Sequence, residues 1–554
     1  MKYAGEKKLS IWTFFSFLFF AILFLFIIYP LTLVLYKSII DPSSGAFTLE
    51  YLAKFFTKKF YWGTLLNSLE VTTCSTLLAA LLGLPMAYIM RSTVIRGSSW
   101  LDILIVISYL SPPFIGAYAW IQLLGRNGIL TNFINSTFSI QFDGIYGFTG
   151  IVLVFTLQSF PLVYMYVSGA LRNLDNSLNE AAESLGCSGF KRIVNIIVPL
   201  IMPTLLASSL LVFMRVFADF GTPMLIGEGF KTMPVLVYTQ FMSEVGGDDG
   251  FAAALCVIII TLTILLFFAQ RFLANRNTYT MTALKPMAAE PLPGIKNLLA
   301  HGFIYLVAGL AILPQAVVIY TSFLKSNGGQ VFTGGFALQS YEATLFAKDN
   351  DVIWNTYILG LISIASVVIC GILISYLTVR KPNLLNSTLD TITMFPYIVP
   401  GSVLGIAFLF AFNNPPLLLS GTAIIMIIAF AIRRMPYTIR SSAAALGQIS
   451  PSVEEAAISL GATELKTFSK VTVPMMMPGV LAGAIMSWVT IISELSSSII
   501  LYTNNTQTLT IAIYTEVIRG NYGNASAYST ILTITSILSL LIFYRLTGKR
   551  DISM

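Results

Sequence analysis

Long apolar segments recur along the whole chain, and short polar stretches separate them. An apolar helix needs about 20 residues to cross the hydrocarbon core of a bilayer. The twelve segments of roughly that length are 11–37, 64–90, 101–124, 148–171, 203–227, 251–273, 299–323, 354–379, 388–412, 416–434, 478–502 and 527–546. Strands that cross a bilayer need only about 9–11 residues each. The pattern therefore predicts an all-α polytopic membrane protein with twelve spanning helices.

The overall composition agrees with a chain that lies mostly in lipid. Of its 554 residues, 56% are hydrophobic and 10% are charged, and the mean hydropathy is +0.81. Ordinary soluble domains carry about 25% charged residues. The chain has four cysteines and one histidine without the spacing of a metal site, and no pair of nucleophile and base stands out. We therefore predict no metal site, no catalytic site and no enzymatic activity in this chain.

The positions of lysine and arginine predict how the chain is oriented. With a cytoplasmic N-terminus, 22 of the 32 basic residues fall in cytoplasmic segments and nine in outer loops, while Arg215 lies within a span. Cytoplasmic loops of membrane proteins carry such an excess. The cytoplasmic group includes Arg433 and Arg434, at the end of the tenth apolar segment. Both chain ends are therefore predicted to be cytoplasmic, and the formal charge of +7 needs no nucleic-acid partner to explain it.

The chain also repeats itself. Residues 177–203 align with residues 452–478 at an offset of 275, and 12 of the 27 positions are identical. Earlier segments align at an offset of 288, which matches Pro112 with Pro400 in the third apolar segment of each half. Six spans return the chain to the same side, so the halves are parallel repeats. The predicted organisation is a first half at 1–273, a polar and proline-rich cytoplasmic linker at 274–298, and a second half at 299–554.

Each copy of the aligned segment predicts a short helix, a glycine turn and a second short helix on the cytoplasmic side. Ser177 and Ser452 each precede a glutamate by three residues, the spacing of a helix capping box. Gly186 and Gly461 are expected to end the first helix. The small apolar faces suit close contact with a partner protein, and packing beneath the membrane domain is the alternative. The residues assigned to docking are Glu180, Ala181, Ala182, Gly186, Glu455, Ala456, Ala457 and Gly461.

These segments, at about 175–200 and 450–475, resemble the EAA loop of binding-protein-dependent ABC importer permeases. In each copy, glycine lies six residues and proline nineteen residues after the glutamate of the Glu-Ala-Ala triplet, as in that family. The family prefers leucine before the proline, where both copies have valine. The resemblance covers essentially the whole chain. It implies a type I ABC importer transmembrane fold made of two homologous six-helix halves.

The resemblance also implies partners. Two copies of an ABC ATPase subunit would bind the loops and would hold ATP and magnesium. This chain itself would hold no cofactor, and it lacks the G-x-x-x-x-G-K-[ST] phosphate loop of such ATPases. An extracytoplasmic substrate-binding protein would deliver the solute to the outer face. Permeases of this kind lie in the inner membrane of bacteria, in contact with lipid.

Ionisable residues inside the predicted spans are candidates for the translocation path. Asp219 and Glu494 each lie 20 residues after the proline of the loop motif, so they occupy equivalent positions in the two halves. Arg215 precedes Asp219 by four residues, a spacing that permits an ion pair on one helix. A structural ion pair together with a carboxylic acid near the outer end of its span is the alternative interpretation.

Residues 218–221 and 493–497, together with the fusion of two halves, resemble permeases for ferric iron and 2-aminoethylphosphonate. Ferric iron is the substrate we expect, and aminoethylphosphonate, thiamine, phosphorylated sugars and polyamines are alternatives. The two acids are compatible with iron or an organic cation, whereas Arg215 favours a phosphonate. An ion-coupled secondary transporter also has twelve helices in two parallel halves. That class would leave the duplicated cytoplasmic loops unexplained.

Overall fold

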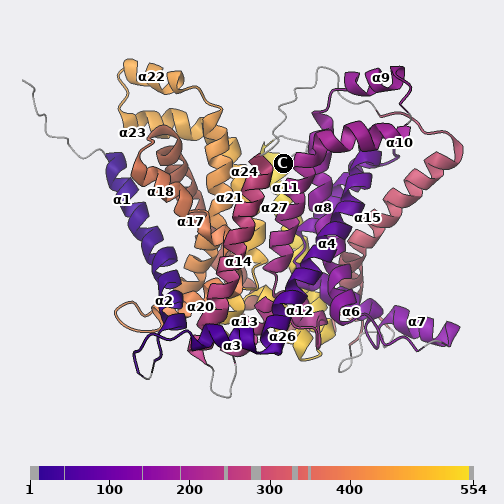
Figure 1. Ribbon diagram of the computed structural model, residues 1–554, viewed down its shortest axis with the longest axis horizontal. Helices are drawn as coiled ribbons and strands as arrows, with labels where there is room; N and C mark the ends of the chain where they lie inside the picture. The colour runs from indigo at the N-terminus through magenta and orange to yellow at the C-terminus, as the bar shows by residue number, and fades with distance from the viewer. Residues whose placement is uncertain are drawn as a thin grey trace, which may run out of the picture.

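The computed structural model describes residues 11–42, 44–139, 141–187, 189–242, 248–275, 289–326, 335–346 and 351–547. In these ranges the regular secondary structure is helical, and extended backbone forms only isolated bridges. Figure 1 shows long helices that run roughly alongside one another, with short helices gathered at both ends of the bundle. The predicted all-α class is confirmed.

The first half follows the predicted order of six spans. Its elements are α1 (Ile11–Leu23), η1 (Phe24–Ile28), α2 (Tyr29–Ile39), α3 (Glu50–Thr57), α4 (Lys59–Ser92), α5 (Ser98–Leu110), α6 (Pro113–Leu124), α7 (Ile129–Phe138), α8 (Gly147–Arg172), α9 (Ser177–Ser184), α10 (Gly189–Arg192), η2 (Ile193–Ile197), α11 (Val198–Phe217), α12 (Gly221–Ile226), α13 (Met233–Phe241) and α14 (Asp249–Asn275). Residues 276–288, the larger part of the predicted linker, lie outside the described residues.

The second half repeats this order, so that α17, α21 and α24 correspond to α4, α8 and α11. Its elements are α15 (Gly294–Ser322), α16 (Gln339–Leu345), α17 (Val352–Arg380), α18 (Leu384–Ile392), α19 (Phe395–Ile398), α20 (Gly401–Phe412), α21 (Ala423–Gly447), α22 (Pro451–Ser459), α23 (Glu464–Thr467), η3 (Phe468–Thr472), α24 (Val473–Ile492), α25 (Ser498–Leu501), η4 (Asn504–Thr506), α26 (Leu509–Ile518) and α27 (Tyr522–Thr547).

Proline shapes the helices in the same way in both halves. Each of the described π-turns η1, η2 and η3 ends two residues before a proline, namely Pro30, Pro199 and Pro474. A proline inside a helix has no N–H to donate, and its ring clashes with the carbonyl four residues earlier. Widening the preceding turn to the i→i+5 pattern accommodates that clash without ending the helix.

The third span of each half is bent at its proline, which cannot continue the helix hydrogen bonds of the preceding segment. The pair α5 and α6 turns by 99° after Pro112, and the pair α18–α19 and α20 turns by 112° after Pro400. Counting each bent pair as one span, eleven of the described spans are long and apolar enough to cross a membrane, and nine are unbroken.

The tenth predicted segment differs from the other eleven. Its residues 423–434 lie in α21, a helix that is long enough to cross but carries three arginines, Arg433, Arg434 and Arg440, and is not among the apolar spans. The apolar segment was expected to end at residue 434, whereas the helix continues to Gly447. The two adjacent arginines therefore lie in the middle of a helix rather than in a cytoplasmic loop, which corrects their predicted placement.

The first helix of each half packs against the opposite half. The N-terminal helices α1 and α2 contact α17, α18 and α20, and α15 contacts α5 and α6. Trp12 of α1 is one residue that packs against the second half. The centroid of its ring lies 4.6 Å from that of Tyr376 and 5.1 Å from that of Phe468. On the same helical segment, the ring of Phe26 lies 5.5 Å from that of Phe412. The two halves are thus interlocked by their first spans.

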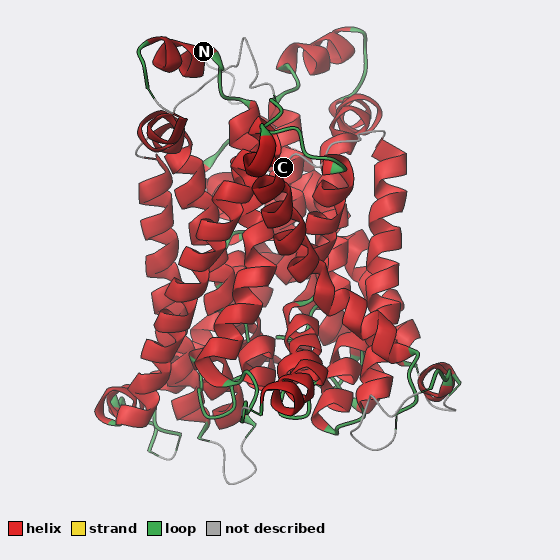
Figure 2. Cartoon of the chain, turned by 90° about the vertical axis from the view of Figure 1, so that its right-hand side faces the viewer, coloured by secondary structure: helices red, strands yellow, loops and turns green. Residues whose placement is uncertain are grey.

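The short helices divide between the two ends of the bundle. Helices α9, α10, α22 and α23 lie at one end, and α3, α7, α13 and α26 lie at the other (Figure 1). The start of α1 and the end of α27 lie at the same end as α9 and α22. Figure 2 shows that these two short helices project beyond the ends of the long ones. The duplicated loops are therefore presented on one face, together with both ends of the described chain.

Candidate translocation cavity and docking loops

The two predicted loops end their first helix with the same turn. Gly186 and Gly461 adopt φ angles of 76° and 91°, a left-handed conformation that glycine adopts without strain. The N–H of Cys187 donates to the carbonyl of Ala182 at 3.0 Å, and the N–H of Ala462 donates to that of Ala457 at 3.1 Å. Both turns are therefore Schellman motifs. The predicted role of the two glycines in ending the helices is confirmed.

The helix starts differ from the expected capping boxes. Helix α22 begins at Pro451, so Ser450 is its cap and accepts the N–H of Ser452 at 3.4 Å. Helix α9 begins at Ser177, whose own N–H donates to the carboxylate of Asp175 at 2.9 Å. Ser177 and Ser452 thus lie inside the first turn, where a side chain cannot serve as the cap. The capping-box prediction was wrong in both copies by one or two residues.

The loops present apolar side chains to the outside. Leu185 and Leu460, which directly precede the turn glycines, are 88% and 90% exposed, and Ile458 is 47% exposed. Ala182 is buried, and Ala457 is half-buried. The remaining residues assigned to docking are exposed: Glu180, Ala181, Gly186, Glu455, Ala456 and Gly461. The structure places all eight on the two loops, and their contact with an ATPase stays a prediction.

The second loop is tied to the membrane-spanning helices by charged contacts. The Arg380 guanidinium lies 2.9 Å from the Glu454 carboxylate, with the two side chains 10% and 13% exposed. The same guanidinium donates to the carbonyls of Leu446, in the last turn of α21, and Ile449, just after that helix. Below the turn, Glu464 accepts a hydrogen bond from the Trp12 indole N–H at 2.7 Å and lies 3.3 Å from Lys381. Helix α1 of the first half therefore helps to hold the loop of the second half.

A cavity of about 630 Å³ lies between the two halves. Helices α5, α8 and α11 of the first half and α21 and α24 of the second half contribute to its wall. Its charged side chains are Arg215, Asp219, Arg433, Arg434 and Glu494. Four tyrosines also line it: Tyr109, Tyr166, Tyr397 and Tyr437. All three residues predicted for the translocation path thus face one cavity.

Asp219 and Glu494 accept equivalent backbone hydrogen bonds in the two halves. Helix α11 ends at Phe217 and α12 begins at Gly221, and within this break the Asp219 carboxylate accepts the N–H of Thr222 at 2.9 Å. Helix α24 ends and α25 begins around Glu494, whose carboxylate accepts the N–H of Ser497 at 3.2 Å. Each acid thus satisfies a free N–H at the start of the following helix. The predicted equivalence of the two acids is visible in their contacts.

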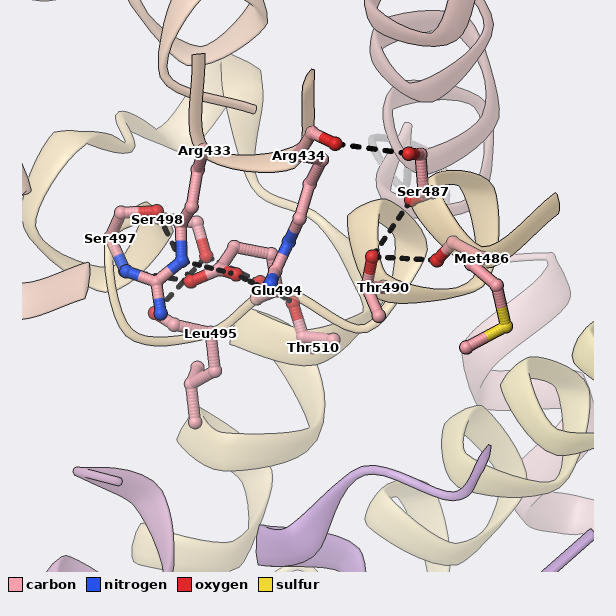
Figure 3. Close-up of polar contacts among 10 residues, drawn as sticks. All are labelled: Arg433, Arg434, Met486, Ser487, Thr490, Glu494, Leu495, Ser497, Ser498 and Thr510. Carbon is pink, nitrogen blue, oxygen red and sulfur yellow. Dashed lines mark hydrogen bonds and ion pairs between the residues drawn. The ribbon is translucent and has the colours of Figure 1, made fainter. Parts of the chain in front are cut away.

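Glu494 also holds two arginines (Figure 3). One of its carboxylate oxygens lies 3.1 Å from the Nε of Arg433 and pairs with the guanidinium of Arg434. A glycine allows this arrangement, because a Cβ at Gly401 would collide with the Arg433 guanidinium. The sequence analysis missed both arginines as cavity residues. Two adjacent charges before Pro436, in a helix whose equivalent segment in the first half has Gln158 and Ser159, were the available signal.

Arg215 has a different partner from the one expected. Its guanidinium carbon lies 4.4 Å from the ring centroid of Tyr109, a cation–π contact between α11 and α5. Among the ion pairs of the described residues, none joins Arg215 to Asp219. The break after Phe217 turns the Asp219 carboxylate toward the start of α12 instead. The i,i+4 ion pair predicted from spacing was therefore wrong.

Close packing between the halves closes one side of the cavity. A Cβ at Gly221 would lie 3.0 Å from the Cβ of Phe114 and 3.2 Å from a methyl group of Leu495 of the other half. Nearby, the Tyr118 hydroxyl donates to the carbonyl of Tyr522 at 2.6 Å. Small residues permit such close approach between helices in membranes. The closed side is the one opposite the docking loops, where α12 and α26 lie (Figure 1).

Comparison with known proteins gives two kinds of match. The sequence profile of the binding-protein-dependent transport system inner membrane component matches residues 79–279 and again residues 367–550. The ferric transport system permease protein FbpB of Actinobacillus pleuropneumoniae is 29% identical over 542 residues, which cover 96% of this chain and 77% of that protein. The putative ferric transport system permease protein FbpB 1 of Haemophilus influenzae is 28% identical over 88% of this chain and 77% of its own length.

A third relative matches only one half's length. The putative 2-aminoethylphosphonate transport system permease protein PhnU of Salmonella typhi is 29% identical over 252 residues, 45% of this chain and 86% of that protein. The family profile, in contrast, matches once in each half and covers more than half of the chain. The chain therefore belongs to the family of binding-protein-dependent transport system inner membrane components, as a permease in which two homologous halves are fused.

Proposed function

We propose that this chain is the permease of an ABC importer that carries ferric iron inward. The observation that supports iron best is that relatives named as ferric transport permeases align with 96% and 88% of the chain, and hence with both halves. A cavity lined by charged and polar groups of both halves gives such a solute a path. Iron is the cargo in this proposal and is not a resident cofactor.

ATP hydrolysis belongs, in this proposal, to separate subunits that hold ATP and magnesium. Two copies of one ATPase would bind the loops around α9 and α22, because the loops share one turn geometry and each presents an exposed leucine, Leu185 or Leu460. An apolar side chain that is almost fully exposed at the same position of both loops is available for burial against a partner. Closing of the ATPase dimer would then move the two loops, and the helices that follow them, relative to each other.

The loops would face the cytoplasm of a bacterium, and the chain would span its inner membrane. Lysine and arginine support this orientation, and both described ends of the chain lie on the loop side. A substrate-binding protein would deliver the solute to the opposite face, where α3, α7 and α26 lie. The closed packing of Gly221 against Leu495 lies toward that face, so the solute would enter the cavity only after the halves separate there.

A second candidate substrate is 2-aminoethylphosphonate. It is supported by the named phosphonate relative and by three arginines in the cavity, since guanidinium groups bind phosphonate oxygens well. The relatives described above give no comparable support to thiamine, phosphorylated sugars or polyamines. The family match favours the ATP-driven importer over an ion-coupled secondary transporter.

Reconstitution tests the proposal. We expect proteoliposomes that contain this chain, the ATPase and the binding protein from neighbouring genes to accumulate radiolabelled iron only when ATP is supplied to the loop side. Vesicles with the chain alone are the control and should remain inactive. Uptake without the ATPase would support an ion-coupled transporter instead. ATP-dependent uptake of aminoethylphosphonate without iron would keep the mechanism and change the substrate.

A further inference from the structure

The cavity carries more positive than negative groups. Three arginines line it, and two carboxylates do. Glu494 uses one carboxylate oxygen for both Arg433 and Arg434, and its other oxygen accepts hydrogen bonds from Ser497. One carboxylate therefore faces two guanidinium groups, and Arg215 stacks on an aromatic ring rather than on an acid. A surplus of positive charge in a site of low dielectric constant attracts an anion.

Several donors in the cavity wall also lack acceptors. The Nη1 atom of Arg433 and the Nε atom of Arg434 are buried without a hydrogen bond, whereas the Nε of Arg433 lies 3.1 Å from the Glu494 carboxylate. A buried guanidinium donor without an acceptor is costly. The Ser493 hydroxyl, which belongs to the same wall, is buried without a partner as well. Residues that line the cavity thus carry charged and hydroxyl donors, at Arg433, Arg434 and Ser493, that are not all satisfied by protein acceptors.

We propose that this cavity contains an oxyanion-binding subsite formed by Arg215, Arg433 and Arg434, and that the permeating iron carries an oxyanion ligand with it. The planar guanidinium group binds phosphate or carboxylate oxygens through two parallel hydrogen bonds. Tyrosine hydroxyls of the same wall, at Tyr397 and Tyr437, add further donors. The inference rests on the proposed function only where it names iron; the subsite itself rests on the charges and donors of the wall.

The same residues are poorly suited to a bare ferric ion. Among the described residues, no group of three or more histidine, cysteine, aspartate or glutamate side chains could hold a metal ion. The two acids of the cavity already accept hydrogen bonds, and Glu494 is neutralised by arginine. A transport site must also release its solute, so moderate binding through an outer ligand serves better than a full set of protein ligands. An oxyanion on the iron provides the surface that the arginines recognise.

Direct binding tests the subsite without reference to iron. We expect the full-length chain in lipid nanodiscs to bind inorganic phosphate in isothermal titration calorimetry. The variants R433Q and R434Q should each weaken binding about ten-fold, the size of one charge-assisted hydrogen bond. R440Q on the same helix is the matched control, because Arg440 pairs with Asp390 outside the cavity, and should bind like the wild type. No phosphate binding by the wild type, or equal binding by all variants, would overturn the subsite.

A third variant and a transport experiment complete the test. R215Q removes a cavity charge without leaving Glu494 unpaired, so it reports on the subsite even if R433Q or R434Q does not fold. In the reconstituted importer, the binding protein would be supplied with iron and phosphate that carry different radiolabels, and both labels should enter the vesicles together. Entry of iron without phosphate would overturn the shared passage and leave the iron importer intact. Failure of iron to enter, with phosphate binding preserved, would overturn the proposed substrate and leave the subsite intact.

Discussion

The two halves share their backbone geometry and differ in the charges that hold it. Both loops end in a Schellman turn at an equivalent glycine, and both fifth spans break at an equivalent acid. The second half adds Arg433 and Arg434 against its acid, Glu494, while the first half has Gln158 and Ser159 at the equivalent positions. Duplication has therefore kept the turns, breaks and helix starts, and it has left the buried ion pairs to diverge.

The loops show the same contrast. The second loop is held to α17 by Arg380 and Glu454 and to α1 by Trp12 and Glu464. In the first loop, the Arg192–Glu183 pair at 2.9 Å joins α10 to α9 within the loop, and Glu183 is largely exposed. Among the ion pairs of the described residues, the Arg380–Glu454 pair thus links the second loop to the bundle, and the Arg192–Glu183 pair lies within the first loop. The comparison predicts unequal responses to equivalent mutations in the two halves.

The largest inequality should appear at the two acids of the cavity. Glu494→Gln leaves Arg433 and Arg434 facing each other without their acid, and removal of one partner of a buried pair costs about 3–5 kcal/mol. Asp219→Asn should change stability by less than about 0.5 kcal/mol, because asparagine still accepts the N–H of Thr222 and is as good a cap as aspartate. Thermal unfolding of the two variants in detergent measures the difference. Equal losses of stability would show that the ion pairs of the second half carry no special weight.

Transport assays on the same variants distinguish a role of Asp219 on the translocation path from a purely structural role. If Asp219 lies on the path, Asp219→Asn should slow iron uptake while the protein stays as stable as the wild type. Normal uptake by a stable Asp219→Asn protein would leave the residue with a purely structural role at the start of α12.

An intermediate and equal effect is expected at the two turn glycines. Proline at position 186 or 461 cannot adopt a positive φ and removes the N–H that bonds to Glu183 or Ile458. Each change should disturb its turn by about 3 kcal/mol and should uncouple ATP hydrolysis from transport. Gly189→Ala is the control, because this glycine is helical and a Cβ there meets open space. Coupled transport by both proline variants would argue against docking at these turns.

The smallest effects should again be unequal between the loops. Arg380→Gln removes the charged partner of the mostly buried Glu454 and should lower the stability of the loop by about 1–3 kcal/mol. The loss should be visible as faster hydrogen exchange in α22. Arg192→Gln breaks a largely exposed pair, which contributes about 0–1 kcal/mol, and exchange in α9 should change little. Equal protection losses in α9 and α22 would contradict the different anchoring of the two loops.

The sequence predicted features that depend on neighbouring residues. Runs of apolar residues set the helices, Pro112 and Pro400 set the bends of the third spans, and Gly186 and Gly461 set the loop turns. Each of these follows from the conformation of one short segment, and the internal repeat supplied an independent second copy. The helix starts were misplaced because a cap depends on where the first turn begins, which spacing alone does not fix.

Contacts between distant segments could not be predicted in the same way. Spacing suggested Asp219 as the partner of Arg215, but the helix breaks between them and Tyr109 takes that place. Arg433 and Arg434 follow an apolar run as cytoplasmic charges would, yet α21 continues and brings them to Glu494, about 60 positions along the chain. A buried charge takes the partner that the assembled helices bring to it. The chain by itself therefore determined the helices, the turns and the repeat, whereas only the tertiary structure decided which charges share the cavity.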